Sequence, residues 1–99
     1  MCVFGLVVRF DLPDAAAAAT FDKVVADVAP TMVQAEPGTY VYNTHVVVDA
    51  PLSRIFYEVY RDRAALDEHE ARPATAAFLA QVRALGPVVR VEAVTPDQW

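Results

Sequence analysis

Hydrophobic and polar positions along the chain predict four strands. Residues 2–11 alternate between two faces and are rich in β-branched and aromatic types, which is typical of a strand. Further strands are expected at residues 39–48, 54–61 and 88–94. The segment 49–54 (DAPLSR) contains a turn-favouring proline, so it is predicted to be the loop that joins the second and third strands into a hairpin.

The segment 12–38 predicts a helix, because its apolar residues recur at helical spacing behind Asp14, a suitable N-cap. Pro30 lacks a backbone donor and is expected to kink or split this helix near its end. The Glu-Pro-Gly sequence at residues 36–38 is expected to stop the helix and turn the chain.

Two shorter helices are predicted after the third strand. Asp62 is the expected cap of a helix that runs to about Glu70. Pro73 suits the first turn of a second helix over residues 73–85, which ends at Gly86 and Pro87.

The predicted order is β-α-β-β-α-β, an α+β ferredoxin-like arrangement that forms one domain over residues 1–99. Strands one and three are expected at the centre of a four-stranded antiparallel sheet, with the helices on one face. Both faces of the first three strands are largely hydrophobic, whereas a sheet with one wet face would carry polar residues there. We therefore expect two subunits to bury their open sheet faces against each other as a dimeric α+β barrel.

Composition restricts the class of protein. Of the 99 residues 56% are hydrophobic, more than a small monomer needs, which indicates further burial at a subunit interface or in a pocket. No apolar run reaches the roughly 18 residues of a membrane span, and the N-terminus lacks the features of a signal peptide, so a cytoplasmic location is expected. The net charge of −5 argues against nucleic-acid binding, and one cysteine allows no internal disulfide.

Glu58 is the first candidate for chemistry. It lies in the middle of an expected interior strand, where an ionised carboxylate costs several kcal/mol unless it has a donor. It is either a catalytic group or a structural carboxylate paired with His69, with an arginine or with a tyrosine hydroxyl.

His69 is the second candidate. It shares an inward helical stripe with Ala65 and Leu66, and imidazole titrates in the range that suits proton transfer near neutral pH. The alternative is a hydrogen-bonded core histidine. His45 is expected to be a residue of the sheet or its rim, and Trp99 either docks on a partner or stays unattached.

Three segments together resemble the antibiotic biosynthesis monooxygenase domain family. They are EPGTYVY at residues 36–42, FYEVYRDRAALDEHEARP at 56–73 and AFL at 77–79. The resemblance implies a homodimeric α+β barrel with a pocket between the sheet and helices of each subunit. It also implies oxidation of a phenolic, quinol-like or polyketide-type aromatic molecule by O₂ without a metal or flavin cofactor.

The resemblance implies roles for particular residues. His69 is the preferred acid and base, and Glu58 is expected to orient it or to anchor the pocket. The residues expected to bind the substrate are Tyr60, Phe56, Tyr42, Phe4 and Leu66.

One departure from the family pattern leaves other functions open. Many relatives have Ser-Pro-His-Phe where this chain has Arg72, Pro73, Ala74 and Thr75, so a second histidine is missing. The alternatives are a dimeric accessory protein that binds a small molecule without converting it, and an isomerase-type enzyme that uses the same residues for proton transfer.

Overall fold

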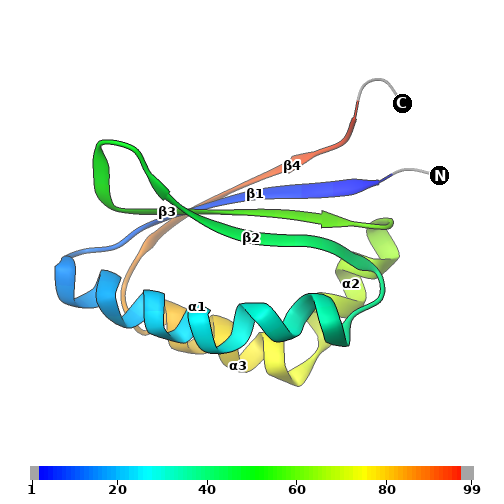
Figure 1. Ribbon diagram of the computed structural model, residues 1–99, viewed down its shortest axis with the longest axis horizontal. Coiled ribbons are helices and arrows are strands. Elements are labelled where there is room, and N and C mark those ends of the chain that lie inside the picture. The colour runs from blue at the N-terminus through cyan, green and yellow to red at the C-terminus, as the bar shows by residue number, and fades with distance from the viewer. Residues whose placement is uncertain (1–2, 97–99) are drawn as a thin grey trace.

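The computed structural model describes residues 3–96 and confirms the ferredoxin-like fold. The elements are β1 (Phe4–Asp11), α1 (Ala15–Ala35), β2 (Thr39–Val47), β3 (Ala50–Tyr60), α2 (Arg63–Ala71), α3 (Pro73–Arg83) and β4 (Val88–Val94). The strands form one antiparallel sheet in the order β2-β3-β1-β4, so β1 and β3 are central as predicted. All three helices lie on one side of this sheet (Figure 1).

The helix starts follow from the predicted caps. The carboxylate of Asp14 accepts a hydrogen bond from the Ala17 amide at 2.8 Å, and that of Asp62 accepts one from the Ala65 amide at 2.8 Å. α1 continues through Pro30, so the proline does not split the helix. The carbonyl that loses its donor belongs to Ala26, which is exposed, and water can satisfy it there. None of the helices within residues 3–96 is long and apolar enough to cross a membrane.

The predicted loop at residues 49–54 is wrong. The hairpin turns over Val48 and Asp49, and Val47 already pairs with Ala50 across the turn. Asp49 adopts a φ of 61°, a left-handed conformation that aspartate tolerates better than most residues. Pro51 is an exposed residue of β3, close to the register shift in the paired strand β2, so its missing donor is tolerated.

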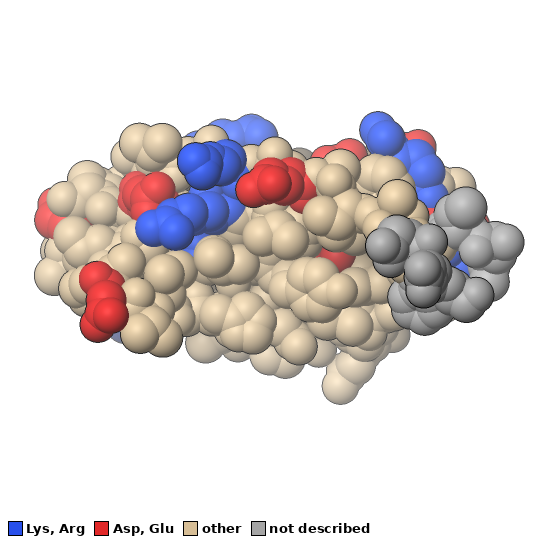
Figure 2. Space-filling model, turned by 90° about the horizontal axis from the view of Figure 1, so that it is seen from above, with Lys and Arg blue, Asp and Glu red and all other residues tan. Residues whose placement is uncertain are grey.

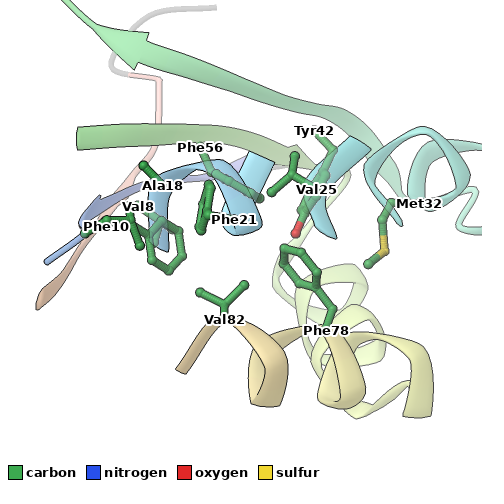
Figure 3. Packing of buried hydrophobic residues seen from close by; sticks show 11 residues of the cluster. Val8, Phe10, Ala18, Phe21, Val25, Met32, Tyr42, Phe56, Phe78 and Val82 are labelled. Carbon is green, nitrogen blue, oxygen red and sulfur yellow. The ribbon is translucent and has the colours of Figure 1, made fainter. Parts of the chain in front are cut away.

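An aromatic cluster holds α1 and α3 against the sheet. The ring of Phe56 in β3 lies at centroid distances of 5.4 Å from Phe10 and Tyr42, 5.9 Å from Phe21 and 6.1 Å from Phe78. Figure 3 shows these side chains converging from the sheet, α1 and α3. Each aromatic pair adds about 0.5–1.5 kcal/mol beyond burial, so the cluster fixes how far α3 stands from the sheet.

No helix of residues 3–96 covers the other face of the sheet. Its register brings apolar residues together at one end, where Gly5 of β1 lies between Val59 of β3 and Val94 of β4. At the other end Arg9 binds Asp11 and Ser53. Figure 2 looks onto this face and shows a mainly uncharged surface with charged groups gathered in a few places. The expected apolar open face is therefore present over part of the sheet only.

Candidate active site

A cavity of about 310 Å³ lies between the helix-facing side of the sheet and helices α2 and α3. Most of its wall is apolar and comes from β1, β3, β4 and α3. The polar and charged residues on the wall are Tyr42, Glu58, His69, Glu70, Thr75 and Arg83. Both predicted catalytic residues therefore border the same cavity.

Three of the five predicted substrate-binding residues line the cavity, namely Tyr42, Phe56 and Leu66. Tyr60 is 0% exposed and does not belong to the wall, because its ring is buried in a second cluster with Leu66. Phe4 packs against the same cluster, and the guanidinium of Arg63 lies 5.2 Å from its ring centroid. Tyr60 and Phe4 therefore do not line the cavity. They pack in the cluster that includes Leu66, which does line it.

His69 is held by a carboxylate that the sequence analysis did not select. Its Nδ1 lies 2.7 Å from Oε1 of Glu36, and the two side chains are 5% and 7% exposed. An anionic carboxylate only accepts hydrogen bonds, so Nδ1 carries the hydrogen. The geometry of the imidazole ring then directs Nε2 away from Glu36, and Nε2 has no hydrogen bond to any of residues 3–96.

Glu36 is itself held from two further sides. Thr39 Oγ1 donates to Oε1 at 2.8 Å, and Arg72 Nη1 donates to Oε2 at 2.8 Å. These bonds and the one from His69 come from β2, α2 and the residue between α2 and α3. Hydrogen bonds from several elements fix the carboxylate in place.

A signal for Glu36 was present in the sequence. It is the C-cap residue of α1, and a negative charge there faces the negative end of the helix dipole. An acidic residue in that position needs a cationic or donor partner. The following Gly38 allows one to approach, because a Cβ at Gly38 would lie only 2.6 Å from the Cβ of Ala65 in α2.

Glu58 is paired with one of the partners considered for it, a tyrosine hydroxyl. Its Oε1 accepts a hydrogen bond from the hydroxyl of Tyr60 at 2.5 Å, and within residues 3–96 no hydrogen bond joins it to His69. The hypothesis that Glu58 orients His69 is therefore wrong, because Glu36 binds the ring nitrogen. The expected roles of Glu58 as a catalytic group and as an anchor of the cavity wall stay predictions.

Burial changes the pKa of two groups on the cavity wall, Glu58 and Tyr42. Burial raises the pKa of Glu58 above its ordinary value, and the Tyr60 hydrogen bond and the nearby His69 offset this only in part. Burial, together with the charges of Glu58 and Glu36, also raises the pKa of Tyr42 and keeps its hydroxyl protonated. The cavity thus offers an imidazole, a carboxyl group that binds its proton more tightly than usual and a neutral phenol.

His45, one of the two remaining candidates, lies away from this cavity. His45 is exposed on β2, as expected of a rim residue. Trp99 lies outside the described residues. Within residues 3–96 no three histidine, cysteine, aspartate or glutamate side chains gather in a way that could hold a metal ion.

Comparisons with known proteins agree with the fold. The family model described as antibiotic biosynthesis monooxygenase matches residues 3–81. The solved structure of Rv0793 from Mycobacterium tuberculosis is 26% identical with a TM-score of 0.85, and the match covers 98% of this chain and 97% of that chain. No curated protein matches the chain.

Two further solved structures share the fold. SnoaB, a cofactor-independent oxygenase from Streptomyces nogalater, is 23% identical with a TM-score of 0.85, covering 100% of this chain and 97% of that chain. A candidate antibiotic biosynthesis monooxygenase from Caulobacter crescentus CB15 is 23% identical with a TM-score of 0.90, covering 98% and 92%. Because the family model spans most of the sequence, from the first central strand to the last helix, the chain belongs to the antibiotic biosynthesis monooxygenase family.

Proposed function

We propose that this protein is a cofactor-independent monooxygenase that oxidises a phenolic or quinol-like aromatic molecule with O₂. The observation that carries the proposal is the buried pair of His69 and Glu36 at the edge of a mostly apolar cavity. Family membership supports the class of reaction. Glu58, on the same wall, is proposed to anchor the pocket.

The first step is a proton transfer. Nε2 of His69 accepts the proton of a phenolic or enolic hydroxyl, and the Glu36 carboxylate stabilises the imidazolium through the hydrogen on Nδ1. This is the arrangement by which a carboxylate orients a catalytic histidine and favours its charged form. Its result is an electron-rich anion in the cavity.

The second step uses the substrate as the reductant. The anion gives one electron to O₂, and the substrate radical and superoxide combine to form a carbon–oxygen bond. The peroxide then loses water, so a C–H carbon of a phenol becomes a quinone carbonyl while the second oxygen atom leaves as H₂O. All electrons come from the substrate, and the balanced step requires no external reductant.

The cavity suits a flat aromatic ligand. Phe56 and Phe78 give it aromatic walls, Leu66 adds an aliphatic side, and its volume of about 310 Å³ fits a small ring system. An apolar wall also excludes water from the charged intermediates, which strengthens the interactions that stabilise them.

We further propose that the protein acts as a homodimer through the apolar part of its open sheet face. Tyr57, Val59 and Val94 border a hollow on that face, and a second copy would bury it. The exposure of the large hydrophobic residues Tyr57 and Val94, at 43% and 40%, supports this proposal.

Oxygen uptake with hydroquinones, naphthols and anthrones tests the function. His69→Ala should reduce the rate by about 10²-fold or more, because general acid–base catalysis has that magnitude. The matched control is His45→Ala, which removes the other of the two histidines from an exposed site and should leave the rate unchanged. A wild-type rate in His69→Ala, or no uptake with any of these compounds, would contradict the proposal.

Proton transfer without oxygen is the second candidate function, because the His69–Glu36 pair moves a proton whether or not O₂ follows. Product formation at an unchanged rate under strict anaerobiosis would favour such an isomerase. Binding of these compounds without any conversion in air would favour the accessory protein suggested by Ala74.

A further inference from the structure

The hydroxyl of Thr75 is an unsatisfied polar group inside the protein. The residue is 1% exposed, and its Oγ1 has no hydrogen-bond partner among residues 3–96. A buried hydroxyl without a partner costs stability, and nearly all buried polar groups in folded proteins have one. Valine would fill the same space without this cost, so the hydroxyl needs an explanation.

The position of Thr75 explains why a hydroxyl is present there. It lies in the first turn of α3 and lines the same cavity as His69 and Glu58. Farther along α3 the cavity wall is apolar at Phe78 and Val82. Because Thr75 lines the cavity, a molecule bound there can supply the missing hydrogen bond once rotation of the side chain turns the hydroxyl toward it.

We propose that Thr75 Oγ1 forms a hydrogen bond with a second oxygen atom of the substrate, while the hydroxyl at the first oxygen donates to Nε2 of His69. The site then selects aromatic molecules with two oxygen substituents over those with one. The inference deepens the proposed function, because it names the substrate class of the same cavity. A hydroxyl both donates and accepts, so it serves either a carbonyl or a second hydroxyl.

Thr75→Val separates a binding role from a structural one. The substitution keeps the branched shape and removes only the hydroxyl. If the hydroxyl serves a ligand, the free protein becomes more stable and the ligand binds less tightly. If it serves the fold, stability falls.

The binding test uses anaerobic calorimetric titration of 1-naphthol and 1,4-dihydroxynaphthalene, a pair that differs by one hydroxyl. Wild type should bind the dihydroxy compound more tightly. Thr75→Val should weaken binding of 1,4-dihydroxynaphthalene about five- to tenfold, the effect of one hydrogen bond, and change 1-naphthol binding less than about twofold. Thr75→Ser, which keeps the hydroxyl, should retain the preference.

The stability test is thermal unfolding without ligand. Thr75→Val should raise Tm by several degrees. Thr20→Val is the matched control, since Thr20 is an exposed residue of α1, and neither its Tm nor its binding should change appreciably.

Three results would overturn the inference: equal weakening of both compounds by Thr75→Val, a lower Tm for that variant, or no binding of 1,4-dihydroxynaphthalene to the wild type. Oxygen uptake is measured separately. Uptake that depends on His69 without discrimination by Thr75 would defeat this inference alone, and discrimination without uptake would defeat the proposed function alone.

Discussion

His69 and Glu36 are 33 positions apart in the sequence, yet Nδ1 of the imidazole lies 2.7 Å from Oε1 of the carboxylate. The fold brings Glu36, the residue after α1, against the last turn of α2 and buries both side chains there. Arg72 completes the group with a bond of 2.8 Å to the other carboxylate oxygen. The arrangement makes Glu36 a positioning residue for the proposed base.

Glu36→Gln should lower the oxidation rate by about 10²-fold or more while leaving binding of 1-naphthol nearly unchanged, because the variant keeps the cavity but no longer stabilises the imidazolium. It should also cost about 1–3 kcal/mol of stability through the loss of charge-assisted bonds. Oxygen uptake and urea unfolding measure the two effects. Glu68→Gln, at an exposed position of the same helix as His69, is the control. An equal loss in both variants would show that the position of Glu36 has no special role.

Glu58 should make stability depend on pH. Burial raises its folded pKa above the ordinary 4.5, so the folded protein binds this proton more tightly than the unfolded chain does. The stability it contributes is fully present below the unfolded pKa and is lost as pH rises through the raised folded pKa. Glu58→Gln stays neutral, so its stability relative to wild type should increase over that pH range.

Urea unfolding of Glu58→Gln and wild type at a series of pH values from 4 upward measures this difference. The comparison removes the contributions of all other carboxylates. Glu68→Gln should give a difference that changes little with pH, since Glu68 is exposed. A constant difference for Glu58→Gln as well would contradict the expectation.

Gly38 should be required for the close approach of α2 to the turn after α1. A Cβ there would lie 2.6 Å from the Cβ of Ala65, so Gly38→Ala should push α2 away and destabilise the protein by about 1–3 kcal/mol. Because Ala65 and His69 share a helix, oxidation should also slow. The double variant Gly38→Ala with Ala65→Gly removes the clash and should regain stability, less about 1 kcal/mol for glycine in a helix. Failure of the second substitution to restore stability would rule out the clash as the cause.

Tyr57→Lys should dissociate the proposed homodimer. Tyr57 is 43% exposed and borders the hollow on the open sheet face, where a buried lysine charge would lack a partner. Size-exclusion chromatography with light scattering should show dimers for wild type and monomers for the variant. Val33→Lys places the same charge on α1 at an equal exposure of 43% and should leave the dimer intact. A monomeric wild type would defeat the proposal directly.

Much of the fold was predictable from the sequence because its signals are local. Alternating strands, the caps Asp14 and Asp62 and the start of α3 at Pro73 depend on neighbours a few positions away, and the structure confirms them. The hairpin turn was misplaced because Pro51, a residue type that favours turns, lies within β3. Its true position at Val48 and Asp49 depends on how β2 and β3 pair.

The sequence by itself determined the order of elements, the apolar character of the sheet and the importance of His69 and Glu58 as buried polar residues. Only the tertiary structure decided which carboxylate binds the imidazole and that Tyr60 donates to Glu58 from outside the cavity. It also decided that the Thr75 hydroxyl has no hydrogen-bond partner in the part of the chain that the structure describes. The physical reason is the separation along the sequence over which each interaction acts. Periodicity and capping act within a few turns of chain, whereas a hydrogen bond at 2.7 Å is specified by the packing of whole helices that are distant in sequence.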